Sequence, residues 1–222
     1  MAKLVWDQAG ERRYETGVKY GVLYPIQADG KYTKGVVWNG LTSVTESPSG
    51  AEPTSLYADD IKYMTMVSAE EFGGTIEAYT YPEEFEECDG SKSMVPGVYL
   101  GQQSRTTFGL CYRTVIGNDT KMDGYGYKLH IVYGALASPS EKAYATINDS
   151  PEAITFSWEF TTTPVNVTGF KPTSCITIDS TKVEAEKMTA LEAALYGTED
   201  KEAYLPMPDE IATIVGYTPI AG

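Results

Sequence analysis

Apolar and polar residues alternate with a period of two over much of the chain, a pattern typical of β-strands that have one buried face. The clearest run covers residues 153–161, where polar residues separate Ile154, Phe156, Trp158 and Phe160. Because one face of this run is apolar and the other polar, we expect it to lie centrally in an antiparallel sheet.

Further strands are predicted where short apolar runs lie between turn residues such as Gly, Pro, Asn and Asp. These runs are residues 18–24, 36–45, 56–67, 75–81, 98–100, 105–116, 127–133, 174–179 and 210–216. Residues 46–55 contain Pro48, Gly50 and Pro53, which do not continue a strand interior. We therefore expect a long, mobile loop there.

One helix is predicted, from residue 182 to residue 196. Thr181 and Glu184 have the spacing of a capping box, and Gly197 suits the position after the last helical turn. Apolar residues recur at helical spacing along this segment, which indicates that one face packs against a sheet.

The chain of 222 residues is long enough to bury a core, and its sequence contains neither an internal repeat nor a visible interdomain linker. Many short strands followed by one late helix favour a single α+β domain, mainly an antiparallel sandwich or barrel. Residues 1–15 are polar and show no period. They are predicted to form an N-terminal arm, followed by one domain over residues 16–222.

The chain is acidic, with 17 Lys and Arg against 31 Asp and Glu and a formal charge of −14. An acidic surface does not favour binding to a phosphate backbone, although a surface along which DNA must slide would also be negatively charged.

Tyrosine is frequent, with 17 residues against 6 Phe. Because Tyr is both a good strand former and a common interface residue, both explanations stay open.

The three cysteines, Cys88, Cys111 and Cys175, are odd in number and widely spaced, which argues against a disulfide framework or a zinc site.

The first residues lack the apolar run of a signal peptide, and no apolar stretch of about 18 residues follows. We therefore expect a soluble protein made in a reducing cytoplasm, with no cofactor or metal.

Residues suited to catalysis are few. His130 is the only histidine and is expected on the partly exposed face of a strand. The sequence contains neither the nucleophile-elbow motif of serine hydrolases nor a glycine-rich loop that binds phosphate. Carboxylates gather at Asp59 and Asp60 and between Glu83 and Asp89, and both groups are interpreted as solvated surface. Adjacent aspartates on a strand point to opposite faces, which spoils an acid–base pair. The sequence predicts a protein that is not an enzyme.

Six short segments occur in an order that resembles the major tail (tail tube) proteins of long-tailed bacteriophages. They are residues 21–25 (GVLYP), 37–42 (VWNGLT), 46–53 (ESPSGAEP), 77–82 (EAYTYP), 109–113 (GLCYR) and 148–153 (NDSPEA). The resemblance covers roughly residues 16–209, and the N-terminal arm and the residues after Pro208 match least.

The resemblance implies two packed antiparallel sheets with one flanking C-terminal helix. It also implies a structural virion protein that forms stacked rings, expected to be hexameric, and is assembled in the host cytoplasm into the tail tube through which DNA is ejected. The expected partners are further copies of the chain, a tape-measure protein, a tail-tip initiator and a tail terminator. DNA is expected only in passage, and no membrane is involved.

Two sets of candidate residues follow from this resemblance. The loop expected to contact the next ring contributes Glu46, Pro48, Gly50, Glu52 and Pro53. Acidic side chains expected to line the lumen and repel DNA are Asp59, Asp60 and Glu77, which lie on predicted strands.

Two other classes of protein remain as alternatives. A non-catalytic carbohydrate-binding β-sandwich module would also be acidic and rich in Tyr, and it would need exposed aromatic residues in a groove. A hydrolase with an unfamiliar site at Asp59 or Asp60 is the third class, which turnover of a substrate would reveal.

Overall fold

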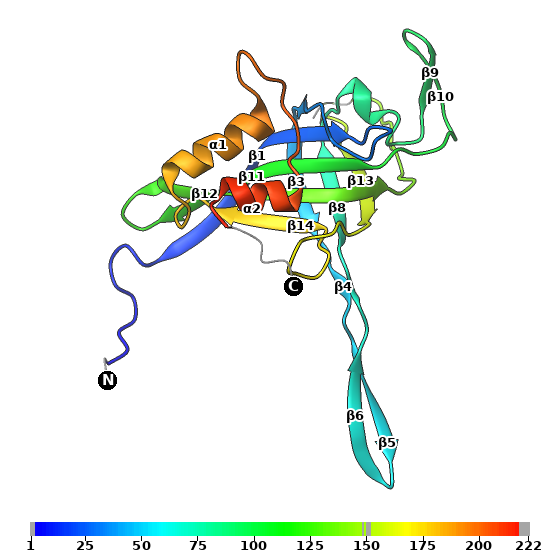
Figure 1. The fold of residues 1–222 in the computed structure, drawn as a ribbon. Helices are drawn as coiled ribbons and strands as arrows, with labels where there is room; N and C mark the ends of the chain where they lie inside the picture. Colours follow the sequence, from blue (N-terminus) through cyan, green and yellow to red (C-terminus); the bar gives the residue numbers. More distant parts are fainter. Residues whose placement is uncertain (1–2, 148, 150–151, 218–222) are drawn as a thin grey trace.

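The computed structural model describes residues 3–147, 149 and 152–217, and in these the chain is mainly β, as predicted (Figure 1). Eight of the described strands form one antiparallel sheet in the order β2-β1-β11-β12-β13-β8-β3, with β14 pairing along β12. Their bounds are β1 Arg13–Pro25, β2 Val36–Trp38, β3 Leu41–Glu46, β8 Gly73–Ala78, β11 Phe108–Asn118, β12 Met122–Ala137, β13 Phe156–Thr162 and β14 Cys175–Asp179. The predicted run 153–161 corresponds to β13, and its interior position between β12 and β8 is confirmed.

Strand β12 bends this sheet. Residues 128–132 of β12 pair with β14, whereas residues 135–137 pair with β13. Between them Gly134 has a φ of +59°, and a Cβ at this position would collide with the carbonyl oxygen of Thr163. The bend brings the two halves of the sheet face to face, with a core between them.

The strands at the two ends of the sheet order, β2 and β3, are joined by Asn39 and Gly40, and Gly40 has a φ of +78°. The run 36–45 therefore forms two strands, whereas the sequence predicted one. Because β2 pairs with β1 and β3 pairs with β8, this turn is a corner that carries the chain from one half of the sheet to the other. The sheet curls back toward itself.

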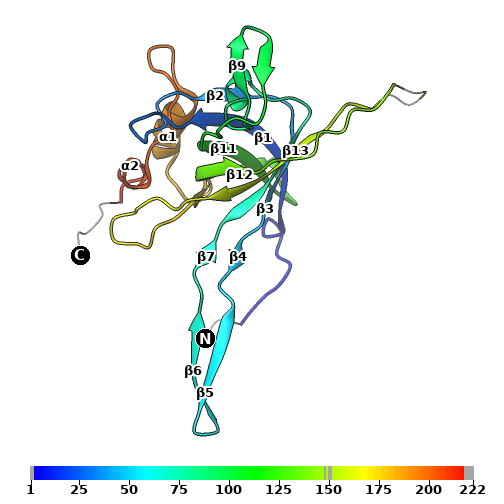
Figure 2. The ribbon, with the colours of Figure 1, turned by 90° about the vertical axis from the view of Figure 1, so that its right-hand side faces the viewer.

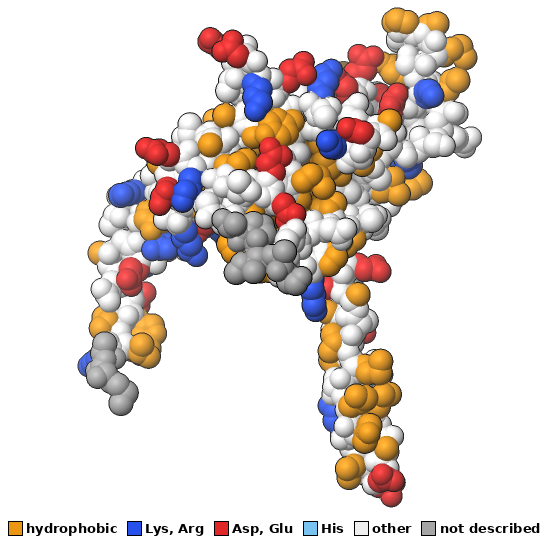
Figure 3. All heavy atoms as spheres, viewed as in Figure 1, with side chains coloured by type: hydrophobic (Ala, Val, Ile, Leu, Met, Phe, Trp, Pro, Cys, Tyr) orange, Lys and Arg blue, Asp and Glu red, His pale blue; other side chains and the backbone are white. Residues whose placement is uncertain are grey.

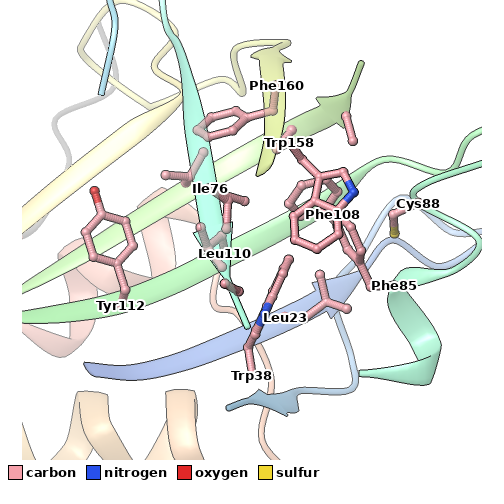
Figure 4. Close-up of a cluster of buried hydrophobic side chains, with 14 residues drawn as sticks. Leu23, Trp38, Ile76, Phe85, Cys88, Phe108, Leu110, Tyr112, Trp158 and Phe160 are labelled. Atoms are coloured by element: carbon pink, nitrogen blue, oxygen red, sulfur yellow. The ribbon is translucent and has the colours of Figure 1, made fainter. Parts of the chain in front are cut away.

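The core between the two halves is rich in aromatic side chains (Figure 4). Trp158 is fully buried and packs at steep angles against Trp38 and Phe85, with ring centroids 5.9 and 5.0 Å apart. Burying one large apolar side chain contributes roughly 1.5–3 kcal/mol, so this cluster is a major source of stability.

The acidic segment from Glu83 to Asp89 is only partly the solvated surface that the sequence predicted. Phe85 in the 3-10 turn η1 (Glu83–Phe85) is fully buried in the aromatic core. Asp89 is also buried and forms ion pairs with Arg105 and Lys142. The segment is therefore anchored to the body at two points.

Two helices, α1 (Ala185–Tyr196) and α2 (Pro208–Ile214), cover the opposite face of the β1–β11–β12–β14 half (Figure 1). A second apolar cluster lies beneath them and includes Cys111, Leu129, Ile131, Met188, Leu191, Leu195 and Ile211. Neither of these described helices has the length and apolar character needed to cross a membrane.

Helix α1 begins at Ala185, later than the predicted residue 182. The predicted capping box does not form, because the Thr181 hydroxyl donates to the Asp179 carboxylate instead. Glu184 occupies the N-cap position without a side-chain capping hydrogen bond.

Helix α2 replaces the strand that the sequence predicted over residues 210–216. Pro208 lies in its first turn together with Asp209 and Glu210. A proline with a preset φ and carboxylates near the positive end of the helix dipole both favour a helix start at this point. Residues 218–222, the end of the predicted domain, lie outside the described residues.

Candidate assembly surfaces

A long two-stranded ribbon projects from the body between β3 and β8 (Figures 1 and 2). This segment, residues 47–72, is called the arm below. It contains β4 (Ser49–Gly50), β5 (Pro53–Ala58), β6 (Ile61–Val67) and β7 (Glu70–Glu71), with β4 pairing to β7 and β5 to β6. At its root the Ser47 amide donates to the Gly73 carbonyl and the Thr162 hydroxyl donates to the Phe72 carbonyl, which holds the arm to the sheet.

The predicted strand 56–67 is in fact a hairpin whose turn lies at Asp59 and Asp60. Both residues have positive φ, +52° and +60°, as the two central residues of a type I′ turn require. The expectation that they lie on a strand was therefore wrong. They lie at the far tip of the arm, the point most remote from the body (Figure 2).

The five loop candidates do lie together, at the root and the first part of the arm. Glu46 is the last residue of β3, Pro48, Gly50 and Glu52 follow it, and Pro53 is the first residue of β5. The predicted mobile loop 46–55 is instead one side of a paired ribbon, since Ser49 and Gly50 pair with Glu71 and Glu70.

Apolar side chains are exposed on both faces of the arm, because every residue of β6 is exposed. Figure 3 shows those that face the viewer. Tyr57 and Tyr63 near the tip are 72% and 68% exposed. The other large exposed apolar residues of the arm are Leu56, Ile61, Met64, Met66 and Val67. An isolated two-stranded hairpin is at best marginally stable in water, so a ribbon with this surface is suited to packing against another chain.

Two further apolar segments project from the body. The hairpin formed by β9 (Lys92–Val95) and β10 (Val98–Leu100) turns at Pro96 and Gly97 and exposes Met94, Val95, Val98, Tyr99 and Leu100. The N-terminal arm exposes Leu4, Val5 and Trp6. The N-terminal arm ends earlier than the predicted residue 15, because β1 begins at Arg13. Residues 1 and 2 lie outside the described part of the chain.

Sequence analysis did not single out the β9–β10 hairpin as a surface. The signal was the run SMVPGVYL, in which a Pro-Gly turn joins the triplet SMV to the apolar triplet VYL. Only the second triplet was assigned to a strand.

Glu77 lies where the sequence predicted, on a strand. It is on the outer face of the β3–β8–β13 half, where its carboxylate accepts a 2.8 Å hydrogen bond from the Ser43 hydroxyl. The strand pairing places these side chains on that face: Ser43, Thr45, Thr75, Glu77, Ser157, Glu159 and Thr161. These seven include two carboxylates and no basic residue, so the face is polar and acidic.

A polar cluster lies at the root of the arm. The His130 ring stacks flat on Tyr112, with centroids 4.8 Å apart, and its Nδ1 is 3.4 Å from a carboxylate oxygen of Glu46. Its Nε2 is 3.0 Å from the Thr114 hydroxyl and 3.5 Å from Glu15. His130 is therefore partly buried between two carboxylates, one at the arm root and one near the start of β1.

The pKa of Glu46 is lowered from its ordinary value of 4.5. The neighbouring His130 side chain is the largest cause, the Tyr112 hydroxyl adds to it, and both outweigh the opposing effect of burial. For Glu15, burial acts to raise the pKa, but the Lys128 ammonium and the Thr114 hydroxyl reverse the direction and lower it.

The cysteines are free thiols, with Cys88 and Cys111 buried and Cys175 half-buried. Burial raises the pKa of both Cys88 and Cys111 to about 12, so both thiols stay protonated at neutral pH. In the described part of the chain, no group of three or more His, Cys, Asp or Glu side chains is arranged to hold a metal ion.

Comparison with known proteins does not extend this description. No protein-family model matches the chain, and no curated protein matches it significantly.

Proposed function

We propose that this chain is a structural protein that polymerises as stacked rings into the tail tube of a long-tailed bacteriophage, and that it adopts the tail-tube fold. The observation that carries the proposal is the arm, an apolar ribbon that extends well beyond the body and whose faces are exposed in the single chain. The sequence resemblance to tail-tube proteins supplies the class, and hexameric rings are part of that expectation.

Ring closure needs surfaces on two sides of each copy, and the described sheet offers unpaired strand edges on both sides of the β11–β12 pair. Among the described strands, β14 pairs only with β12, and β2 covers only residues 21–23 of β1. The first half of β1 and the outer edge of β14 therefore flank the β11–β12 pair on opposite sides. In a ring, the edge of one copy would pair with the edge of the next, which also removes an aggregation hazard.

The outer face of β3–β8–β13 supports the assignment of a lumen. It lies on the half of the sheet opposite the one that the helices cover, and it presents Glu77 and Glu159 among Ser and Thr side chains. A negatively charged face repels phosphate groups and lets DNA slide. Glu77 therefore stays a candidate for the lumen, whereas Asp59 and Asp60 at the arm tip are better placed for contact with another ring.

Negative-stain electron microscopy of the concentrated protein, beside light scattering over a dilution series, tests the proposal. Rings or hollow filaments with a bore of at least about 20 Å, the width of a duplex, are expected. A protein that stays monomeric at every concentration, and also when added to tail-tip initiator complexes, would contradict it. The tape-measure and terminator proteins are proposed as partners on the same basis.

One groove keeps the carbohydrate-binding module as a second candidate. It has a volume of about 380 Å³ and is lined by Tyr20, Val22, Val37, Arg113 and Tyr196, among others. Tyrosine rings beside an Arg are able to stack on and hydrogen-bond a sugar. Binding on a glycan array that is lost in a Tyr20→Ala variant, together with a strictly monomeric protein, would favour this class over the tube.

A further inference from the structure

The arm and the β9–β10 hairpin project from opposite ends of the body. In Figure 1 the arm points down and the hairpin points up, and the view turned by 90° in Figure 2 shows the same arrangement. Two copies stacked in the same orientation therefore bring the arm of one toward the hairpin of the other.

The arm is long enough for such a contact. At about 3.3 Å per residue, the roughly 12 residues from root to tip span about 40 Å. A small domain is about 30 Å across, so the tip reaches well past the surface of its own body.

The hairpin offers a preorganised apolar surface. Met94, Val98 and Leu100 are exposed on it, and Met94 is 63% exposed. At its root the Tyr99 hydroxyl donates a 2.9 Å hydrogen bond to Glu83 of η1, which limits the directions in which the hairpin can point. The arm presents Met64 and Met66 on one face, and methionine adapts its shape to an apolar partner.

The charges of the two segments are of opposite sign. Residues 47–72 contain five acidic residues and one basic residue, with Asp59 and Asp60 at the tip. Residues 91–104 contain Lys92 and no acidic residue. Opposite charges at the rim of an apolar contact favour the correct pairing and its register.

We propose that the arm of one copy packs against the β9–β10 hairpin of a second copy in the next ring. This inference rests on the proposed function and deepens it, because it names the surface that receives the arm. The contact is heterologous, and since it does not close on itself it repeats along the stack.

Cross-linking of the full-length protein tests the pairing. In a Cys175→Ser background, a Tyr57→Cys variant is mixed with a Met94→Cys variant, assembled, and treated with a short bismaleimide. The two remaining cysteines are buried and do not compete. We expect a covalent dimer in severalfold higher yield than when Tyr57→Cys is mixed with a control, Glu199→Cys, an exposed position on the loop after α1.

A charge exchange gives an independent readout. Lys92→Glu is expected to reduce the amount of stacked assembly severalfold, and Asp60→Lys in the same chain is expected to restore it. Both residues are exposed and lie outside the core, so each variant should keep the near-ultraviolet circular dichroism of the parent, although the positive φ of Asp60 suits Lys less well than Asp. Tubes that form without arm–hairpin cross-links would overturn the pairing and leave the proposed function standing. A parent protein that forms no rings or tubes counts against the proposed function itself.

Discussion

The hydroxyl of Tyr112 donates a 2.6 Å hydrogen bond to the carboxylate of Glu46. The two residues come from β11 and β3, which are not neighbours in the sheet order. The bond therefore spans the space between the two halves of the curled sheet and ties the root of the arm to the centre of the body.

Tyr112→Phe removes this bond while keeping the buried ring. We expect the free energy of unfolding to fall by roughly 1.5 kcal/mol, the lower end of the range for a hydrogen bond to a charged group, because the Glu46 side chain is partly exposed. Urea denaturation measures the change. Tyr79→Phe is the matched control, because Tyr79 is exposed and its hydroxyl makes no hydrogen bond to the described residues. Equal effects in the two variants would mean that the Tyr112–Glu46 bond adds nothing.

The stability of the fold should depend on Glu46 in acid. The pKa of this carboxyl is lower in the folded protein than its ordinary value of 4.5, so the unfolded chain binds its proton more readily. The contribution of Glu46 is therefore complete above pH 4.5 and is lost as the pH falls through the lower, folded value. Glu46→Gln should flatten this part of the stability–pH curve, measured by thermal melts between about pH 2 and 7. A curve parallel to that of the parent protein would contradict the prediction.

Replacing the arm should separate folding from stacking. In the proposed variant, a two-residue Asn-Gly turn joins Glu46 directly to Gly74, which the strand pairing allows because these two residues pair with each other. We expect a folded chain with an unchanged aromatic core, detected by near-ultraviolet circular dichroism, and no stacked tubes in the microscope. Intact tubes from this variant would show that the arm is dispensable.

Gly134→Ala should destabilise the fold strongly. The positive φ alone disfavours a side chain by about 1–2 kcal/mol, and the collision with Thr163 adds to this. Gly101→Ala, where a new Cβ meets no heavy atom within 4 Å, is the control and should have little effect. Thermal unfolding of both variants measures the difference. Similar midpoints would mean that the bend in β12 does not depend on glycine.

The acidic sheet face predicts a gain of DNA binding on charge reversal. Glu77→Lys combined with Glu159→Lys should leave assembly intact and make tubes retain DNA at low salt, with retention lost as salt rises. Filter binding over a salt series measures this effect. The control is Glu186→Lys, which reverses a charge on α1, on the side of the body that the helices cover. Tubes of this variant should not retain DNA. Equal retention by both variants would place the lumen elsewhere.

Much of the sheet was predictable because its strands have one apolar and one polar face. The alternation around Trp158 identified an interior strand, and Glu77 was assigned to a strand correctly. The arm was missed for a physical reason. Both of its faces are exposed, and its turn uses Asp59 and Asp60 rather than the Asn-Gly pair that commonly marks a hairpin.

The polar cluster at the arm root could not be found from local patterns. Tyr112 and His130 meet by pairing across β11 and β12, and Glu15 lies on the neighbouring strand β1, whereas Glu46 reaches them because the sheet curls. Helix α2 was missed because its β-branched residues resemble a strand, although Pro208 already carried the signal for a helix start.

The arm and the hairpin at opposite ends of the body give any stack built through them a direction. One terminus of such a filament presents only arm tips, which are acidic and carry tyrosine, and the other presents only hairpins with Lys92. Proteins that start and stop the filament must therefore recognise different surfaces. A filament begun from one of them has all its subunits facing the same way, so subunits add at a single growing end.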